Sequence, residues 1–312
     1  MNGNHSRRVE RGLQLVVGVA LTMGLALAAV ACSDEGGSGD GPLIVATHSL
    51  LGDLAVNVFG DEAEVQVVMP AGTDPHEFEP SAAQVAMLNE ADLVVANGLG
   101  FEVGLTDALD AAVADGVTVL ELGEGLDPLP LAEDDGEDPH WFTDPLRMAA
   151  AAGLVATAAE SVEGLDPTVV AEQAASHASA IEAADAEIAA DLETIPEDQR
   201  QMVTNHEVFG YFADRYGFEV VGTIIPSGTT LAEPSSSELA DLVAVIEETG
   251  VPAVFADTSS SADLADVLAE ETGEEIAVVE LFSESLGEEG SGAETYLELI
   301  RTNADRIMGA LA

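Results

Sequence analysis

Short β-rich runs alternate with helical stretches through most of the chain, and this alternation restricts the possible fold more than any other feature. The expected strands form two sets, residues 43–47, 64–69, 92–97 and 117–122 and then residues 202–204, 219–225, 253–256 and 276–280. Helical stretches separate the strands within each set, and strands that alternate with helices form parallel sheets. We therefore expect an α/β fold of two lobes, each a roughly four-stranded parallel sheet with flanking helices.

One long helix is expected between the two sets. Residues 167–194 are rich in Ala, Glu and Ile, and they contain neither Gly nor an internal Pro. A helix of about 28 residues is roughly 40 Å long, which suits a rigid strut between lobes. The expected division is an N-terminal lobe over 42–163, a linking helix over 164–196 and a C-terminal lobe over 197–312. His177, within this helix, is expected to be a solvated residue.

The first 31 residues are predicted to be a lipoprotein signal peptide. Three arginines precede an apolar run that ends in small residues just before Cys32, the only cysteine. Cys32 stands where a bacterial lipobox places the lipidated residue, and residues 32–41 predict a flexible tether. The body is then expected at the extracytoplasmic face of the bacterial cytoplasmic membrane, held by its lipid, or in the periplasm. A membrane-spanning helix is the alternative for the apolar run.

The charge balance excludes several classes of function. The chain has 59 Asp and Glu against 8 Lys and Arg, a formal net charge of −51, and all eight basic residues are Arg. The absence of lysine excludes a P-loop and Schiff-base chemistry. Without clustered basic residues the surface cannot follow nucleic-acid phosphates, so no nucleic-acid partner is expected. We interpret the negative charge as an adaptation for solubility or salt.

Four of the six histidines follow expected strands, at the edge where open α/β sheets bind ligands. They are His48, His76, His140 and His206. His76 and His140 each end an Asp-Pro-His tripeptide, in which proline restricts the backbone. Asp74 and Asp138 could therefore orient the second ring N–H, as carboxylates do behind metal-ligating histidines. Together these histidines indicate a metal site.

Seven segments of the chain, from about residue 43 to the C-terminus, carry a family resemblance. They are residues 45–53, 72–80, 97–100, 138–141, 205–212, 233–235 and 281–287. In these segments the chain resembles the zinc/manganese substrate-binding lipoproteins of bacterial ABC transporters, the cluster A-I binding proteins. The resemblance implies two α/β lobes joined by a long helix, with one metal ion between them. It also implies a membrane permease and its ATPase as partners, and ion capture by a monomer without catalysis.

The resemblance implies two metal ligands from each lobe. Carried over by motif, they are His76, His140, His206 and Glu284. Glu284 is one methylene longer than the Asp that is usual in the family, so Asp257 and Glu280 stand as alternatives for the fourth ligand. His48 and Glu207 are expected beside the site, as possible ligands or as neighbours of the ligands.

The ligand set favours one metal. Three imidazoles and one carboxylate suit four-coordinate Zn²⁺, whereas Mn²⁺ prefers harder oxygen ligands. Manganese members of the family often carry a carboxylate where this chain has His206. We therefore expect zinc, with manganese as the alternative. A zinc hydrolase, which needs an open coordination position, and a lipid-anchored adhesin are further alternatives that the sequence favours less.

Overall fold

The computed structural model describes residues 41–132, 136–272 and 276–311. The predicted signal peptide, Cys32 and the tether up to residue 40 lie outside these described residues, as do residues 133–135, 273–275 and 312. The described residues all belong to one structural unit, Gly39–Ala312. Within them, every helix is too short or too polar to span a lipid bilayer.

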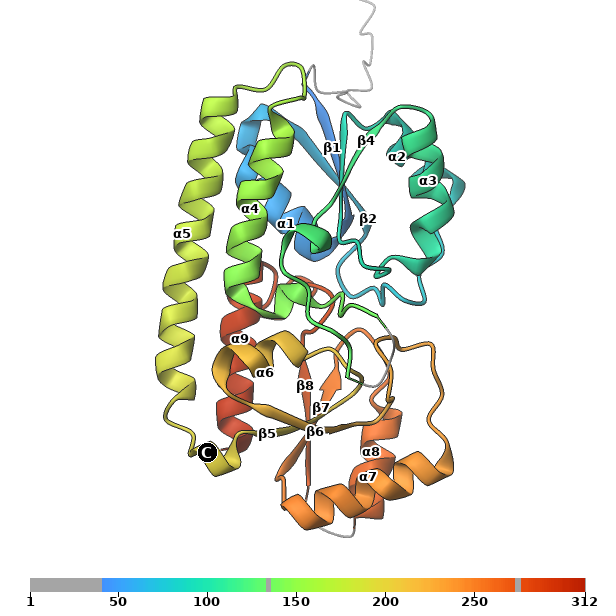
Figure 1. The fold of residues 1–312 in the computed structure, drawn as a ribbon, viewed down its shortest axis with the longest axis vertical. Helices are drawn as coiled ribbons and strands as arrows, with labels where there is room; N and C mark the ends of the chain where they lie inside the picture. The colour runs from blue at the N-terminus through green and yellow to red at the C-terminus, as the bar shows by residue number, and fades with distance from the viewer. Residues whose placement is uncertain (1–40, 133–135, 273–275, 312) are drawn as a thin grey trace, which may run out of the picture. The chain divides into compact units, whose positions relative to one another are not determined.

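Two parallel four-stranded sheets form the framework (Figure 1). The first contains β1 (Leu43–His48), β2 (Glu64–Met69), β3 (Leu93–Ala96) and β4 (Thr118–Glu121), in the order β2-β1-β3-β4. The second contains β5 (Gln201–Thr204), β6 (Glu219–Thr223), β7 (Ala253–Asp257) and β8 (Ala277–Leu281), in the order β6-β5-β7-β8. Each sheet thus has its first strand between its second and third. The predicted α/β fold of two parallel sheets is confirmed.

Helices connect the strands and cover the sheets. They are α1 (Ser49–Phe59), α2 (Ala82–Glu90), α3 (Thr106–Ala114), α4 (Pro145–Ala159), α5 (Pro167–Leu192), α6 (Gly210–Tyr216), α7 (Ser236–Thr249), α8 (Asp263–Glu271) and α9 (Tyr296–Leu311). Capping boxes at Ser81 and Ser235 satisfy the first free N–H groups of α2 and α7. The sequence analysis did not predict α4, although Asp144 caps it and Pro145 occupies its first turn.

Helix α5 is the expected long helix, with 26 residues. It packs against α1 and α4 from the first half of the chain and against α9 from the second, so it passes beside both sheets (Figure 1). His177 on this helix is only 8% exposed, so the expectation of a solvated position was wrong. The side of α5 that carries His177 is packed because α5 has helical neighbours along its length.

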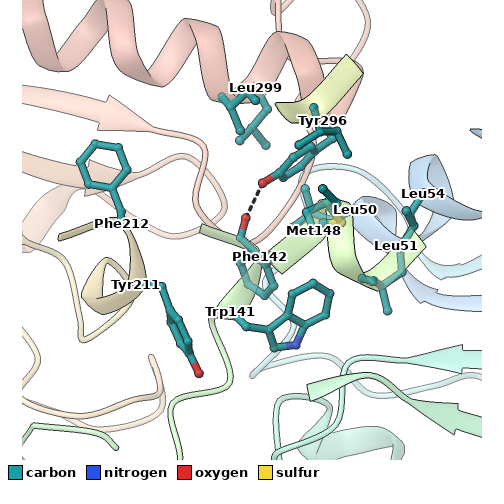
Figure 2. Packing of buried hydrophobic residues seen from close by; sticks show 14 of the residues in the cluster. Leu50, Leu51, Leu54, Trp141, Phe142, Met148, Tyr211, Phe212, Tyr296 and Leu299 are labelled. Carbon is teal, nitrogen blue, oxygen red and sulfur yellow. Dashed lines mark hydrogen bonds between the residues drawn. The ribbon is translucent and has the colours of Figure 1, made fainter. Parts of the chain in front are cut away.

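A single apolar cluster joins the two halves. It contains residues from α1, α4, α5, α6 and α9 together with the inner faces of both sheets. Figure 2 shows part of it, where the hydroxyl of Tyr296 on α9 donates to the carbonyl oxygen of Phe142 over 2.7 Å. Two smaller clusters lie under α2 and α3 and under α7 and α8. The shared cluster holds the two sheets together because separating them would expose it to water.

A buried ionic contact ties α5 to α6. Asp185, which is 3% exposed, accepts from Arg215 Nε over 3.0 Å and from the hydroxyl of Tyr216 over 2.9 Å. We expect Asp185→Ala to lower the free energy of unfolding by about 2 kcal/mol, because it leaves both donors without their acceptor. Chemical denaturation checks this, with Asp191→Ala, at an exposed position of the same helix, as the control. Equal stability of the two variants would contradict the prediction.

Candidate metal centre

Three of the four side chains predicted from the sequence follow the carboxyl ends of strands, one in the first sheet and two in the second. His76 follows β2, His140 immediately precedes the short 3₁₀ helix Trp141–Thr143, His206 follows β5 and Glu284 follows β8. Parallel strands place their carboxyl ends at one edge of a sheet. The two edges face each other here, since donor atoms from these four residues all lie within 4.8 Å of one another. The structure therefore brings the four residues together.

One carboxylate oxygen is the meeting point of the three imidazoles. Glu284 Oε1 lies 2.7 Å from His76 Nε2, 3.2 Å from His140 Nε2 and 3.3 Å from His206 Nε2. All four side chains are buried, with at most 4% of each residue exposed. Burial raises the pKa of Glu284, but the surrounding imidazoles lower it more, so that the pKa stands well below its ordinary value. The carboxylate is therefore ionised and ready to bind a cation.

Asp138 orients the ring of His140. Its Oδ1 accepts from the backbone N–H of His140 over 2.9 Å and lies 2.7 Å from the ring Nδ1. Because an ionised carboxylate only accepts, Nδ1 carries the proton and Nε2 is the atom left for a metal. Burial lowers the pKa of His140, but the charge and hydrogen bond of Asp138, together with Glu284, raise it to about 9. His140 is therefore protonated at neutral pH when no metal competes.

The first tripeptide works differently from the second. Asp74 Oδ1 accepts from the backbone N–H of His76 over 2.9 Å, and its Oδ2 accepts from the Thr230 hydroxyl over 2.9 Å. The ring Nδ1 of His76 has no hydrogen-bond partner among the described residues. The expectation that Asp74 orients this ring was wrong. Its carboxylate instead accepts hydrogen bonds from the backbone of His76 and from Thr230, in the second half of the chain.

The loop that carries Glu284 is hydrogen-bonded to the start of α1 and to the loop after β2. Ser285 Oγ lies 3.1 Å from Ser49 Oγ and accepts from the backbone N–H of Gly72 over 2.8 Å. Ser49 Oγ also accepts from the backbone N–H of Leu286 over 2.9 Å. These contacts set the position of Glu284 between the halves. The sequence analysis quoted the two serines within motifs but assigned them no role, because hydroxyl pairing across 236 residues leaves no local pattern.

The alternative fourth ligands lie outside the group of four. Asp257 is 2% exposed and its Oδ1 accepts from the backbone and hydroxyl of Ser259. Burial and the charge of Glu284 raise the pKa of Asp257 to about 7, which indicates that the two carboxyl groups are close. Asp257 is nevertheless not among the four residues whose donor atoms converge. Glu280 is exposed on β8. Glu207 is 9% exposed and accepts from the backbone N–H of Ala132 through Oε2, over 3.0 Å.

Aromatic rings wall the centre on the side of the first sheet. The ring centroid of Phe101 lies 5.4 Å from that of His76 and 5.9 Å from that of His140. Phe142 lies 6.0 Å from His140, and His48 lies 5.0 Å from Phe101. These rings help to bury the imidazoles, and electrostatic interactions with a bound cation are stronger at a buried site than in water. Neither phenylalanine was predicted from the sequence, although each directly follows one of the seven segments that carry the family resemblance.

Comparison with known proteins identifies the family. The family described as "Zinc-uptake complex component A periplasmic" matches residues 44–310. This chain belongs to that family. It is 31% identical over 297 residues to the manganese-binding lipoprotein MntA of Halalkalibacterium halodurans, which covers 93% of this chain and 96% of that protein. It is 27% identical over 285 residues to the zinc-binding protein TroA of Treponema pallidum, covering 87% of this chain and 89% of that protein.

A solved structure gives the same result for the fold. The periplasmic zinc-binding protein TroA from Treponema pallidum superimposes with a TM-score of 0.81 at 27% identity, covering 87% of this chain and 99% of that chain. The predicted family resemblance is thereby confirmed. The protein is the substrate-binding component of a metal ABC transporter and not an enzyme, a role that implies a permease and an ATPase as partners. Its relatives are named for manganese and for zinc, and MntA is named as a lipoprotein.

Proposed function

We propose that the protein captures one Zn²⁺ ion through His76, His140, His206 and Glu284 and delivers it to its ABC importer. The observation that carries the proposal is the convergence of three Nε2 atoms on one carboxylate oxygen. Three nitrogens and one oxygen from buried side chains are a ligand set for tetrahedral Zn²⁺. A bound divalent ion would replace the short contacts between Glu284 Oε1 and the three Nε2 atoms.

The division of the ligands between the two sheets suggests how capture proceeds. His76 and His140 belong to the first half of the chain, and His206 and Glu284 to the second. A bound ion would therefore link the halves, while α5 and the shared apolar cluster keep the relative movement small. In the same proposal the lipid on Cys32 holds a monomeric protein beside its permease, at the outer face of the cytoplasmic membrane or in the periplasm.

Manganese is the second candidate cargo. A relative of 31% identity is named for manganese, and the buried carboxyl of Asp257 lies close to Glu284. Carboxylate oxygens favour Mn²⁺ over soft or nitrogen-preferring ions. The described ligand group nevertheless contains three imidazoles, and for this reason we place zinc first.

Competition between the two ions tests the proposal. The protein, stripped of metal, is offered Zn²⁺ and Mn²⁺ together and examined by native mass spectrometry, with calorimetric titration of each ion. We expect one tightly bound Zn²⁺ per chain, and loss of most of that affinity in His206→Ala because a ligand is removed. Preferential binding of Mn²⁺ would show that manganese, the second candidate, is the cargo instead of zinc. Zinc binding that is indifferent to His206 would refute the proposed site.

A further inference from the structure

His48 ends β1, and its ring lies beside the candidate metal centre without belonging to the group of four ligands. The residue is 2% exposed, and its ring centroid is 5.0 Å from that of Phe101 and 5.9 Å from that of Phe142. Phe101 also contacts the rings of His76 and His140, and Phe142 contacts the ring of His140. His48 therefore shares its aromatic surroundings with two proposed ligands.

Several polar atoms near His48 lack a hydrogen-bond partner in the described part of the chain. They include both ring nitrogens of His48, Asn97 Oδ1 and Glu284 Oε2. Burial lowers the pKa of His48 to about 3, against the opposing effects of Asn97 and the charge of Glu284. The ring is consequently neutral, with one N–H and one lone pair. Such buried polar groups are almost always hydrogen-bonded in native proteins.

Asn97 offers an acceptor to the single N–H of His48, and its interaction with the ring raises the His48 pKa, as such an acceptor would. Its Nδ2 donates to the carbonyl oxygens of Pro139, over 2.9 Å, and Gly98, over 3.2 Å, so both amide hydrogens are used. Asn97 Oδ1 can only accept, and the single N–H of His48 is the matching donor. The other ring nitrogen is then left as an acceptor.

A direct link connects the segments that carry His48 and Glu284. Their neighbours in the chain, Ser49 and Ser285, are hydrogen-bonded through their hydroxyl groups over 3.1 Å. The free nitrogen of His48 and the second oxygen of Glu284 are thus two acceptors on adjacent segments. A water molecule has two hydrogens and can donate one to each acceptor while its oxygen binds a cation.

We propose, resting on the metal capture proposed above, that His48 is a specificity-determining residue that accepts a hydrogen bond from a water molecule bound to the captured ion. Its partner acceptor for the second hydrogen is Glu284 Oε2. His48 acts through water because it lies outside the group whose donor atoms are within 4.8 Å of one another. The water adds an oxygen ligand, which Mn²⁺ requires more than four-coordinate Zn²⁺ does. His48 therefore raises the affinity of the site for Mn²⁺ relative to its affinity for Zn²⁺.

Replacement of His48 by Phe tests this role, because Phe fills the aromatic space but cannot accept a hydrogen bond. The affinities of metal-free protein for Zn²⁺ and Mn²⁺ are measured separately by titration. In His48→Phe we expect the Mn²⁺ affinity to fall about tenfold, the loss of one hydrogen bond to a polarised water, with the Zn²⁺ affinity unchanged within about twofold. His48→Gln, whose amide oxygen can accept, is expected to restore part of the Mn²⁺ affinity.

A control and a spectroscopic measurement separate this role from a structural one. His177→Phe replaces another buried histidine, on α5, and should leave both affinities unchanged. Substitution of Co²⁺ reports coordination number, and His48→Phe should intensify its visible absorption as the ion becomes four-coordinate. Equal losses of Zn²⁺ and Mn²⁺ affinity, or an unchanged ratio and Co²⁺ spectrum, would overturn the inference. Failure of the wild-type protein to hold either ion would instead refute the metal capture on which it rests.

Discussion

Glu284→Ala is expected to weaken Zn²⁺ binding by about a hundredfold or more, because it removes the only carboxylate among the four proposed ligands. A four-ligand zinc site has a binding free energy of roughly 10–16 kcal/mol, so one ligand accounts for about 3 kcal/mol, or two orders of magnitude. The loss should be larger than this share, because Glu284 Oε1 is also the atom on which the three imidazoles converge. Calorimetric titration of metal-free protein measures it.

Glu280→Ala is the matched control for this prediction. Glu280 lies on β8, shortly before Glu284 in the chain, but it is exposed. The sequence alone had left it as an alternative ligand. Its removal should change Zn²⁺ affinity by less than about twofold, the scale of an exposed charge screened by solvent. If Glu280→Ala lost zinc and Glu284→Ala kept it, the assignment of the fourth ligand would be wrong.

Zinc affinity is expected to rise about tenfold for each pH unit between pH 7 and pH 9. In the metal-free protein the pKa of His140 is raised to about 9, so below that pH a proton must leave Nε2 before the metal can bind. Each unit of increasing pH makes this deprotonation about tenfold easier, and the gain ends once His140 is already neutral. Over the two units the expected change is about a hundredfold.

Proton release measured by calorimetry checks the source of this dependence. At pH 7.5, titrations in buffers of different ionisation enthalpy should show about one proton released for each Zn²⁺ bound. Asp138→Asn removes the charge that raises the pKa of His140, so it should reduce the proton release at this pH. An unchanged pH dependence in that variant would contradict the assignment to His140.

The sequence was sufficient to predict the elements with strong local patterns. Alternating strands, the capping box at Ser235 and the long stretch of α5 each follow from periodicity and helix-capping preferences over a few residues. Helix α4, whose sequence is rich in alanine, was missed. Its Asp144-Pro145 start was the available signal. His177 was misjudged because burial on α5 depends on neighbouring helices that lie far away in sequence.

The residues of the candidate centre also fall into some that local sequence patterns predict and others that such patterns do not predict. His76 and His206 were predictable because they follow strands, and parallel strands bring their carboxyl ends together. His140 lies well beyond the end of β4, and its Asp-Pro-His tripeptide was the signal that named it. The choice among Glu284, Asp257 and Glu280 was not predictable, because it depends on how the loop after β8 is held by Ser49 and Gly72. The difference between Asp74 and Asp138 was also hidden, since identical tripeptides gave the two carboxylates different partners. Long-range contacts decide each of these points.

A crystal structure of the zinc-loaded protein, with anomalous scattering measured at the zinc absorption edge, tests the central claim most directly. The account predicts one strong anomalous peak, about 2.0–2.2 Å from the Nε2 atoms of the three histidines and from a carboxylate oxygen of Glu284. A peak bound by other residues, or the absence of a peak in protein that retains its fold, would contradict it.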